Sequence, residues 1–305
     1  MSGLRVALAG ATGTIGGATE RALVSAGATV IALTREDFRA PTSLADKLKS
    51  ADAVISCIAS RTGAPRDAWA VDHDANLALM TATETAQVNR FILLSAICVQ
   101  KPKLAFQRAK HAFEMKLQET DLAWTIIRPT AFFKSLSGQV ARVKAGKPYW
   151  VFGNGRRTAC KPISNRDLAS FVVCCLQETK SVRKVLPIGG PGPAITPLEQ
   201  AEYLFKTLQK PAKIRHMPVG IFAAAARVLD VAGALFPNVQ DKAEFARTAH
   251  YYASESMLVW DAESAEYRAE ATPEFGTETL FAHYDAVLSG DTHAALGAHA
   301  MFGDA

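Results

Sequence analysis

The stretch GATGTIGG, residues 10–17, has the glycine spacing of a dinucleotide-binding loop. A short apolar run precedes it and an amphipathic run follows it. In such loops the first glycine permits a tight turn, the second lets the backbone approach a pyrophosphate, and the third allows helix and strand to pack closely. The N-terminus of the following helix offers N–H groups and the positive end of its dipole to the phosphates. The sequence therefore predicts a dinucleotide site formed by Gly10, Thr12, Gly13, Thr14, Ile15 and Gly16.

The residue that follows the second predicted strand, TVIALT (29–34), indicates which dinucleotide is bound. Sites for NAD usually carry an acidic residue there, which holds the ribose 2′-hydroxyl, whereas this chain has Arg35. A guanidinium suits the 2′-phosphate of NADP through charge-assisted hydrogen bonds. We therefore expect NADP(H). Glu36 and Asp37 keep NAD(H) open as the alternative, because Arg35 would then pair with one of these acids.

Lys110 and Phe106 occupy the spacing of the Tyr-x-x-x-Lys pair that carbonyl-reducing dehydrogenases use. In AFQRAKHAFE (105–114) the lysine is present, but the residue four positions earlier is a phenylalanine, which has no proton to donate. Lys110 is the predicted catalytic residue. It either binds the nicotinamide ribose or adds positive potential near developing charge; the alternative is a solvated lysine on an amphipathic helix. Phe106 is either the wall of a substrate pocket or ordinary core.

These residues need a scaffold, and strands alternate with helices throughout the first half of the chain. The apolar periodicity predicts strands at 5–10, 29–34, 51–57, 90–96 and 123–128, and helices at 15–27, 74–87 and 104–120. The alternation predicts an α/β fold, a Rossmann-like doubly wound parallel sheet. The small residues that end the third strand, Cys57, Ala59 and Ser60, are then expected beside the adenosine half of the cofactor.

The alternation loosens after about residue 130, which suggests a second, smaller part. The later elements predicted are a helix at 164–177, a strand at 184–190, a helix at 196–210, a strand at 213–218 and an apolar helix at 219–236. We expect an NADP-binding domain over 1–160, to which about 160–190 return. We also expect a C-terminal α+β substrate-binding lobe over 191–290 and a flexible tail over 291–305.

Composition excludes several classes of protein. The net charge of +5 is mild and spread along the chain, which argues against nucleic-acid binding. The five cysteines form no C-x-x-C pair, so no metal site is expected. The first residues read as a strand and not as a targeting segment, and no long uncharged apolar run exists, so a cytoplasmic protein is predicted.

Several stretches together resemble a known family. GATGTIGG, the missing tyrosine before Lys110 and IIRPTAFFKSL (126–136) resemble the atypical short-chain dehydrogenases of the NmrA-like group. VFGNG (151–155), ACKPIS (159–164) and YYASESML (251–258) narrow the resemblance to the NADPH-dependent 8-vinyl reductases of chlorophyll biosynthesis. The resemblance covers residues from about 5 to about 285, and its C-terminal stretches are the more specific.

The resemblance implies a substrate, a cofactor and further site residues. The substrate is divinyl chlorophyllide a or divinyl protochlorophyllide a, and the hydride donor is NADPH. Pro129 and Thr130 are expected beside the nicotinamide. Phe132, Phe133, Tyr251 and Tyr252 are candidate substrate-pocket residues; the alternative is routine packing at a strand end for the two phenylalanines and an interface or rim position for the two tyrosines. Helix 219–236 is expected to be buried in the lobe; the alternatives are an apolar surface for the macrocycle or peripheral contact with a photosynthetic membrane.

Two other functions stay open at this point. One is reduction of a different substrate, as in the isoflavone reductase group, which shares the phosphate loop and a lysine without tyrosine. The other is an NmrA-like sensor that binds NADP(H) without catalysis. Lys110 and the long C-terminal part argue against the sensor. The source of the second hydrogen and the oligomeric state are not given by the sequence.

Overall fold

The computed structural model describes residue 1, residues 3–233 and residues 240–291. It divides into two compact units. The first comprises Met1–Pro129 and Asn165–Ile188, and the second comprises Thr130–Ser164 and the residues from Gly189 onward. The sequence placed residues up to about 160 in the first domain. Residues 130–164 instead belong to the second unit, because the chain leaves the sheet at the end of its fifth strand.

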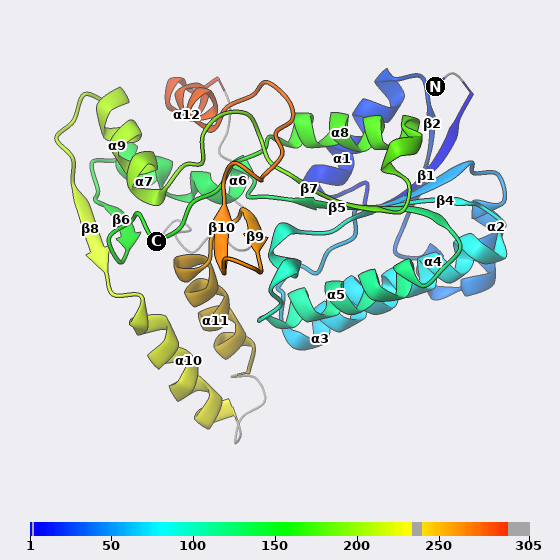
Figure 1. The fold of residues 1–305 in the computed structure, drawn as a ribbon, viewed down its shortest axis with the longest axis horizontal. Coiled ribbons are helices and arrows are strands. Elements are labelled where there is room, and N and C mark those ends of the chain that lie inside the picture. The colour runs from blue at the N-terminus through cyan, green and yellow to red at the C-terminus, as the bar shows by residue number, and fades with distance from the viewer. Residues whose placement is uncertain (2, 234–239, 292–305) are drawn as a thin grey trace. The chain divides into compact units, whose positions relative to one another are not determined.

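A six-stranded parallel sheet lies at the centre of the first unit, with strand order β2-β1-β3-β4-β5-β7 (Figure 1). Its strands are β1 (Arg5–Ala9), β2 (Thr29–Leu33), β3 (Ala53–Ser56), β4 (Arg90–Leu94), β5 (Ala123–Pro129) and β7 (Lys184–Ile188). Every neighbouring pair is parallel. The central strands are buried on both faces, as expected when helices cover a parallel sheet. The predicted doubly wound parallel sheet is confirmed.

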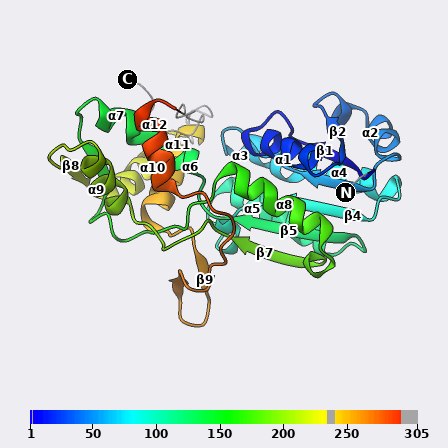
Figure 2. The same cartoon turned by 90° about the horizontal axis from the view of Figure 1, so that it is seen from above.

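Helices cover both faces of this sheet. Helices α1 (Thr14–Ser25) and α8 (Asn165–Gln177) pack against each other on one face (Figure 2). The other face carries α2 (Pro41–Leu48), α3 (Pro65–Ala68), α4 (Asn76–Thr85) and α5 (Ala105–Gln118). Four short turns of helix complete the unit: η1 (Asp37–Arg39), η2 (Trp69–Ala75), η3 (Ile97–Gln100) and η5 (Thr179–Ser181). Of these, η2 is a π-helix, which the sequence did not predict.

The strand order β2-β1-β3 makes a topological switch point between β1 and β3. The chain continues from β1 into α1 on one face of the sheet and from β3 into α3 on the other face, so the two loops diverge from adjacent strand ends (Figure 1). The Cys57 N–H donates a hydrogen bond of 2.9 Å to the Ala9 carbonyl and joins the two strand ends. Doubly wound folds bind their ligands in the crevice at this position.

The second unit contains two small sheets and a helical core. Its strands are β6 (Tyr149–Phe152) paired in parallel with β8 (Ile214–Met217), and β9 (Val259–Asp261) paired antiparallel with β10 (Glu266–Arg268). Its helices are α6 (Phe133–Leu136), η4 (Ser137–Gln139), α7 (Val140–Lys144), α9 (Pro197–Thr207), α10 (Gly220–Gly233), α11 (Gln240–Ser254) and α12 (Leu280–Ser289). Helix α9 begins with the predicted capping box, in which Thr196 and Glu199 cap each other's backbone N–H groups.

The apolar helix predicted over 219–236 corresponds to α10, which ends at Gly233; residues 234–236 lie outside the described residues. Among the residues with described positions, no helix is long and apolar enough to cross a membrane. Peripheral membrane contact by this segment stays a prediction. The predicted flexible tail, 291–305, lies outside the described residues except for Asp291.

Candidate active site

The glycine loop after β1 has the geometry that its spacing predicts. Gly10 has φ +85°, a left-handed conformation that favours glycine, and a Cβ atom there would lie 2.7 Å from the Cys57 carbonyl oxygen. A Cβ atom on Gly16 would lie 2.0 Å from the Gly10 carbonyl oxygen. Gly10 therefore permits the turn, and Gly16 permits α1 to start directly against the loop.

The first turn of α1 suits an anion. Its N-cap residue is Gly13, which has no side chain to accept from the first N–H groups, and no acidic residue occupies the first turn. Thr12, Gly13 and Thr14 are exposed, and Ile15 is half-buried. An exposed helix N-terminus with these properties is a site for a phosphate group.

Arg35 follows β2 at the same edge of the sheet and is exposed. Within the described part of the chain it forms no hydrogen bond or ion pair. Asp37, which was one of the two acids expected to compete for it, is held elsewhere: Thr34 donates to Asp37 through its N–H (2.6 Å), and Lys47 pairs with the same carboxylate at 2.9 Å. Burial alone would raise the pKa of Asp37, but these hydrogen bonds hold it below its ordinary value. The guanidinium of Arg35 is therefore available to a ligand.

Cys57, Ala59 and Ser60 follow β3, beside the glycine loop. Cys57 is half-buried, and burial raises the pKa of its thiol to about 12, so the thiol is neutral at physiological pH and is no nucleophile. Ala59 is exposed and leaves the backbone open to a ligand. The Ser60 N–H donates a hydrogen bond of 3.2 Å to Asp72. The strand end is thus small and uncharged, as predicted for a surface beside a nucleoside.

Lys110 lies on α5 and forms an ion pair with Asp72 of η2, with Nζ and Oδ1 3.0 Å apart. The Lys110 side chain is 9% exposed and that of Asp72 is 0% exposed. The alternative of a solvated lysine is therefore wrong. Asp72 was not predicted as a site residue. The sequence gives no local signal for this role, because the burial of Asp72 between Ala68 and Asn76 is a property of the folded structure.

Phe106 lies one turn before Lys110 on α5 and is half-buried. It packs beside a small cluster formed by Ala68, Ala105 and Ala109. A Cβ atom on Gly63 would lie 3.5 Å from the Phe106 ring, so the loop after β3 passes close to it. One side of the ring thus belongs to the core, and the rest is accessible.

A second buried ion pair lies one turn after Lys110, and the sequence did not predict it. Glu114 is fully buried and accepts hydrogen bonds from the Ser95 hydroxyl and from Arg128, whose Nε lies 3.2 Å from both carboxylate oxygens. These residues belong to α5, to the end of β4 and to β5. Phe106, Lys110 and Glu114 recur every four residues and share one face of α5, which connects this pair to Lys110.

Pro129 is buried at the end of β5, where the first unit ends. Thr130 is 4% exposed and begins the second unit, in which its hydroxyl donates to the Lys161 carbonyl. The backbone of Thr130 is the part of this residue that remains for a cofactor. The roles predicted for Pro129 and Thr130 stay predictions.

The four aromatic residues predicted near the substrate occupy different surroundings within the second unit. Phe132 is half-buried as the N-cap of α6, and Phe133 is 6% exposed in the core, with its ring 5.4 Å from that of His283. Tyr251 is 3% exposed, whereas Tyr252 is 42% exposed, and their rings meet edge to face at 5.6 Å. Phe133 and Tyr251 are buried, whereas Phe132 and Tyr252 offer accessible ring surface, and the substrate role predicted for all four stays a prediction.

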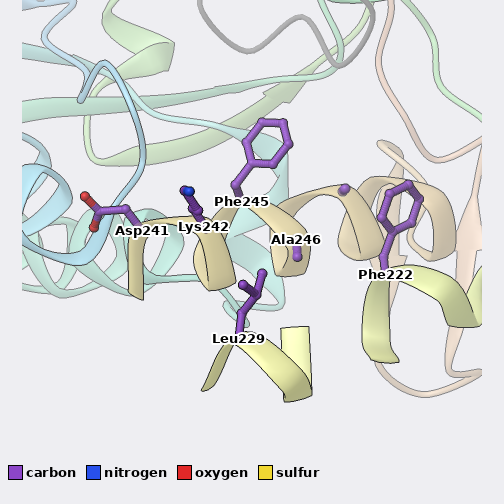
Figure 3. A pocket seen from close by; sticks show the side chains of 7 residues that line it. Phe222, Leu229, Asp241, Lys242, Phe245 and Ala246 are labelled. Carbon is purple, nitrogen blue, oxygen red and sulfur yellow. The ribbon is translucent and has the colours of Figure 1, made fainter. Parts of the chain in front are cut away.

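An apolar hollow of about 470 Å³ lies between α10 and α11 of the second unit (Figure 3). Its lining comes from Phe222 and Leu229 of α10 and from Asp241, Lys242, Phe245, Ala246 and Ala249 of α11. None of the four predicted aromatic residues lines it. The residues that line the hollow belong to the second unit, whereas Lys110 belongs to the first.

Comparison with known proteins identifies the family. A family model of NAD(P)H-binding domains matches residues 35–179. The chain is 43% identical to the chloroplastic divinyl chlorophyllide a 8-vinyl-reductase of Cucumis sativus, over 97% of this chain and 79% of that protein. The chain belongs to the divinyl chlorophyllide a 8-vinyl-reductase family. The reductase of Arabidopsis thaliana is 49% identical over 75% of this chain, which spans 56% of the Arabidopsis protein.

More distant matches lie outside the divinyl chlorophyllide a 8-vinyl-reductase family. The photosystem II assembly factor Ycf39 of Synechocystis is 27% identical over 61% of this chain and 63% of that protein. Among solved structures, UDP-glucuronic acid 4-epimerase of Bacillus cereus in complex with NAD has a TM-score of 0.67 at 15% identity, over 96% of this chain and all of that chain. At this identity the structural likeness shows the fold alone, which is that of nicotinamide-binding epimerases and reductases.

Proposed function

We propose that this protein reduces the 8-vinyl group of 3,8-divinyl chlorophyllide a, or of the corresponding protochlorophyllide, to an ethyl group with NADPH. The observation that carries the proposal is the 43–49% identity to four plant proteins of that name. The balanced reaction takes one vinyl group, one NADPH and one proton to one ethyl group and NADP⁺. The buried Lys110 supports a catalytic protein over a sensor, whereas both would need the glycine loop.

The preference for NADPH over NADH rests on Arg35. Its guanidinium lies after β2, where the adenosine ribose is held in doubly wound folds, and Asp37 is neutralised by Lys47. A free guanidinium at this place attracts the 2′-phosphate of NADPH. The 2′-hydroxyl of NADH offers it no charge.

The Arg35→Gln variant is expected to bind NADPH about 10- to 100-fold more weakly, because a charge-assisted hydrogen bond contributes about 1.5–3 kcal/mol. Binding of NADH should change less than about threefold by the same reasoning. The measurement is a titration of nicotinamide fluorescence with each cofactor. Arg5→Gln is the matched control, because Arg5 is exposed at the opposite, amino edge of the same sheet. An equal loss for both cofactors would contradict the assignment of Arg35 to the 2′-phosphate.

The chemistry of a vinyl group explains why a phenol is dispensable next to Lys110. When bound, NADPH supplies a hydride. A hydride that adds to the terminal vinyl carbon leaves negative charge on the carbon attached to the macrocycle, and the conjugated ring spreads that charge. Carbonyl reduction instead places the charge on one oxygen, which needs an immediate acid. Phe106 supplies no proton, and Lys110 contributes a fixed positive charge.

The direct test is incubation of the folded protein with NADPH and divinyl chlorophyllide a, followed by chromatography of the pigment. We expect monovinyl product in a 1:1 ratio to NADPH oxidised, with a blue shift of the Soret band. Deuterium from labelled NADPH should appear on the terminal carbon of the new ethyl group. Monovinyl chlorophyllide a, which keeps only the 3-vinyl group, is the control substrate and should not react. Protein that binds NADPH but forms no monovinyl pigment would overturn the proposal in favour of a sensor.

A further inference from the structure

The segment that carries Asp72 has an unusual backbone. Residues Trp69–Ala75 form a π-helix between α3 and α4. π-Helical turns are rare and occur mainly near functional sites. Ala68, Asp72 and Asn76, which lie before, within and after this segment, are all buried. The side chain of Asp72 is therefore buried in the interior of the first unit.

Asn76 braces this π-helix. Its Nδ2 donates hydrogen bonds of 3.2 Å to the carbonyls of Val71 and Asp72, and its Oδ1 accepts a 2.5 Å bond from the Ser56 hydroxyl at the end of β3. The side-chain amide thus satisfies carbonyl groups in the π-helical turn. The backbone of Asp72 is therefore held through Asn76 by Ser56, at the end of strand β3, as well as by the π-helix itself.

Asp72 connects two parts of the site. Its Oδ1 lies 3.0 Å from Lys110 Nζ and also accepts the Ser60 N–H at 3.2 Å. Its Oδ2 is buried and has no hydrogen-bond partner among the described residues. Asp72 Oδ1 therefore connects Lys110 of α5 with Ser60 in the loop after β3. A buried carboxylate with one unsatisfied oxygen is costly, and a role in the site explains why it is kept.

The nearly buried ammonium of Lys110 requires a counter-charge. In carbonyl-reducing dehydrogenases the lysine acts together with a tyrosine at the position of Phe106. Phe106 offers Lys110 no oxygen, so the carboxylate is the polar partner that remains. Asp72 is the acidic residue that the structure places against Lys110.

We propose that Asp72 is a positioning residue, which holds the Lys110 ammonium in one orientation toward the bound cofactor and links it to the Ser60 loop. The inference rests on the proposed function, since it assigns Lys110 to the nicotinamide side of the site. Asp72 acts through Lys110 and touches neither substrate nor cofactor. One of the three N–H groups of the ammonium is directed to Asp72, and the others remain for the ribose hydroxyls.

The test is a double-mutant cycle with the variants Asp72→Asn, Lys110→Met and the combination of both. We expect Asp72→Asn to lower kcat/KM and NADPH affinity by about 10- to 100-fold, the contribution of one charge-assisted contact. In the Lys110→Met background the same substitution should cost less than about threefold, because its effect passes through the lysine. Asp74→Asn is the matched control: the same change, in the same π-helix, at a carboxylate that is 67% exposed.

Independent, multiplicative losses in the cycle would overturn the proposal, and so would an Asp72→Asn protein as active as Asp74→Asn. The Asp72→Glu variant keeps the charge and moves it by one methylene. It should fold when Asp72→Asn does not, retain part of the activity, and show the same dependence on Lys110. NADPH affinity, read from nicotinamide fluorescence, tests Asp72 even if divinyl chlorophyllide is not the substrate. Failure of the proposed function therefore remains distinct from failure of this inference.

Discussion

Replacing Gly16 by alanine is expected to weaken NADPH binding by about 100-fold. The added Cβ atom would lie 2.0 Å from the Gly10 carbonyl oxygen, a separation at which the loop and the start of α1 must move apart. That movement misaligns the N–H groups that face the pyrophosphate. Loss of one charge-assisted hydrogen bond, at the upper end of the usual contribution of about 1.5–3 kcal/mol, accounts for the expected factor. Fluorescence titration with NADPH measures it, and far-UV circular dichroism verifies that the variant is folded.

Gly17→Ala is the matched control for this variant. Its Cβ atom would lie 3.3 Å from the Ala11 carbonyl oxygen, a tight contact that a small adjustment relieves. Alanine is also the better helix former by about 1 kcal/mol. We expect NADPH affinity within about threefold of the natural protein. Equal losses for the two variants would show that the start of α1 does not depend on close packing at Gly16.

Replacing Glu114 by glutamine is expected to lower the free energy of unfolding of the first unit by about 3 kcal/mol. The carboxylate is fully buried and neutralises Arg128, whose side chain is 18% exposed. Removing one partner of a buried pair typically costs about 3–5 kcal/mol, because the other charge stays buried without compensation. Partial solvation of Arg128 places the value at the lower end of that range. The expected fall in Tm is roughly 6–10 °C, measured by thermal unfolding.

Glu119→Gln provides the comparison, because Glu119 is the C-cap residue of the same helix and is exposed to solvent. Glu119 and Lys116 form an ion pair of 3.0 Å, in which both side chains are more than half exposed. Exposed pairs of this kind contribute about 0–1 kcal/mol. The Tm of this variant should therefore stay within about 2 °C of the natural protein. A Glu114→Gln protein equally close to the natural Tm would mean that the buried pair contributes no net stability.

The local parts of this structure could be predicted from the sequence. The glycine loop depends on residues that are neighbours in the chain, and its turn and packing follow from missing Cβ atoms at Gly10 and Gly16. The strands of the sheet and helices α1, α4, α5 and α8 follow from apolar periodicity, whereas α2 and α3 were not predicted. Lys110 could be selected because its spacing to residue 106 is a local pattern.

The partners of Lys110 and Arg128 could not be predicted in the same way. Asp72 reaches Lys110 only because the π-helix between α3 and α4 packs against α5, and periodicity in the sequence does not specify a π-turn. Glu114 was more accessible to prediction, since it lies on the stripe of Phe106 and Lys110, where a buried acid implies a cation nearby. The edge strand β7 was predicted as a strand, but its pairing with β5 depends on where the chain returns after 35 residues of the second unit, 130–164.

The return of residues 165–188 to the first unit affects the order in which this unit can fold during synthesis. Helix α8 and strand β7 reach the sheet only after residues 130–164 have been synthesised, so the nucleotide-binding unit stays incomplete until Ile188 has left the ribosome. Until then β5 exposes an unpaired backbone edge, which invites pairing with another chain, and α1 lacks the helix that packs on it. The cofactor-binding unit is therefore not formed by one continuous stretch of the chain. Its maturation on the ribosome is coupled to the emergence of a segment that belongs to the other unit.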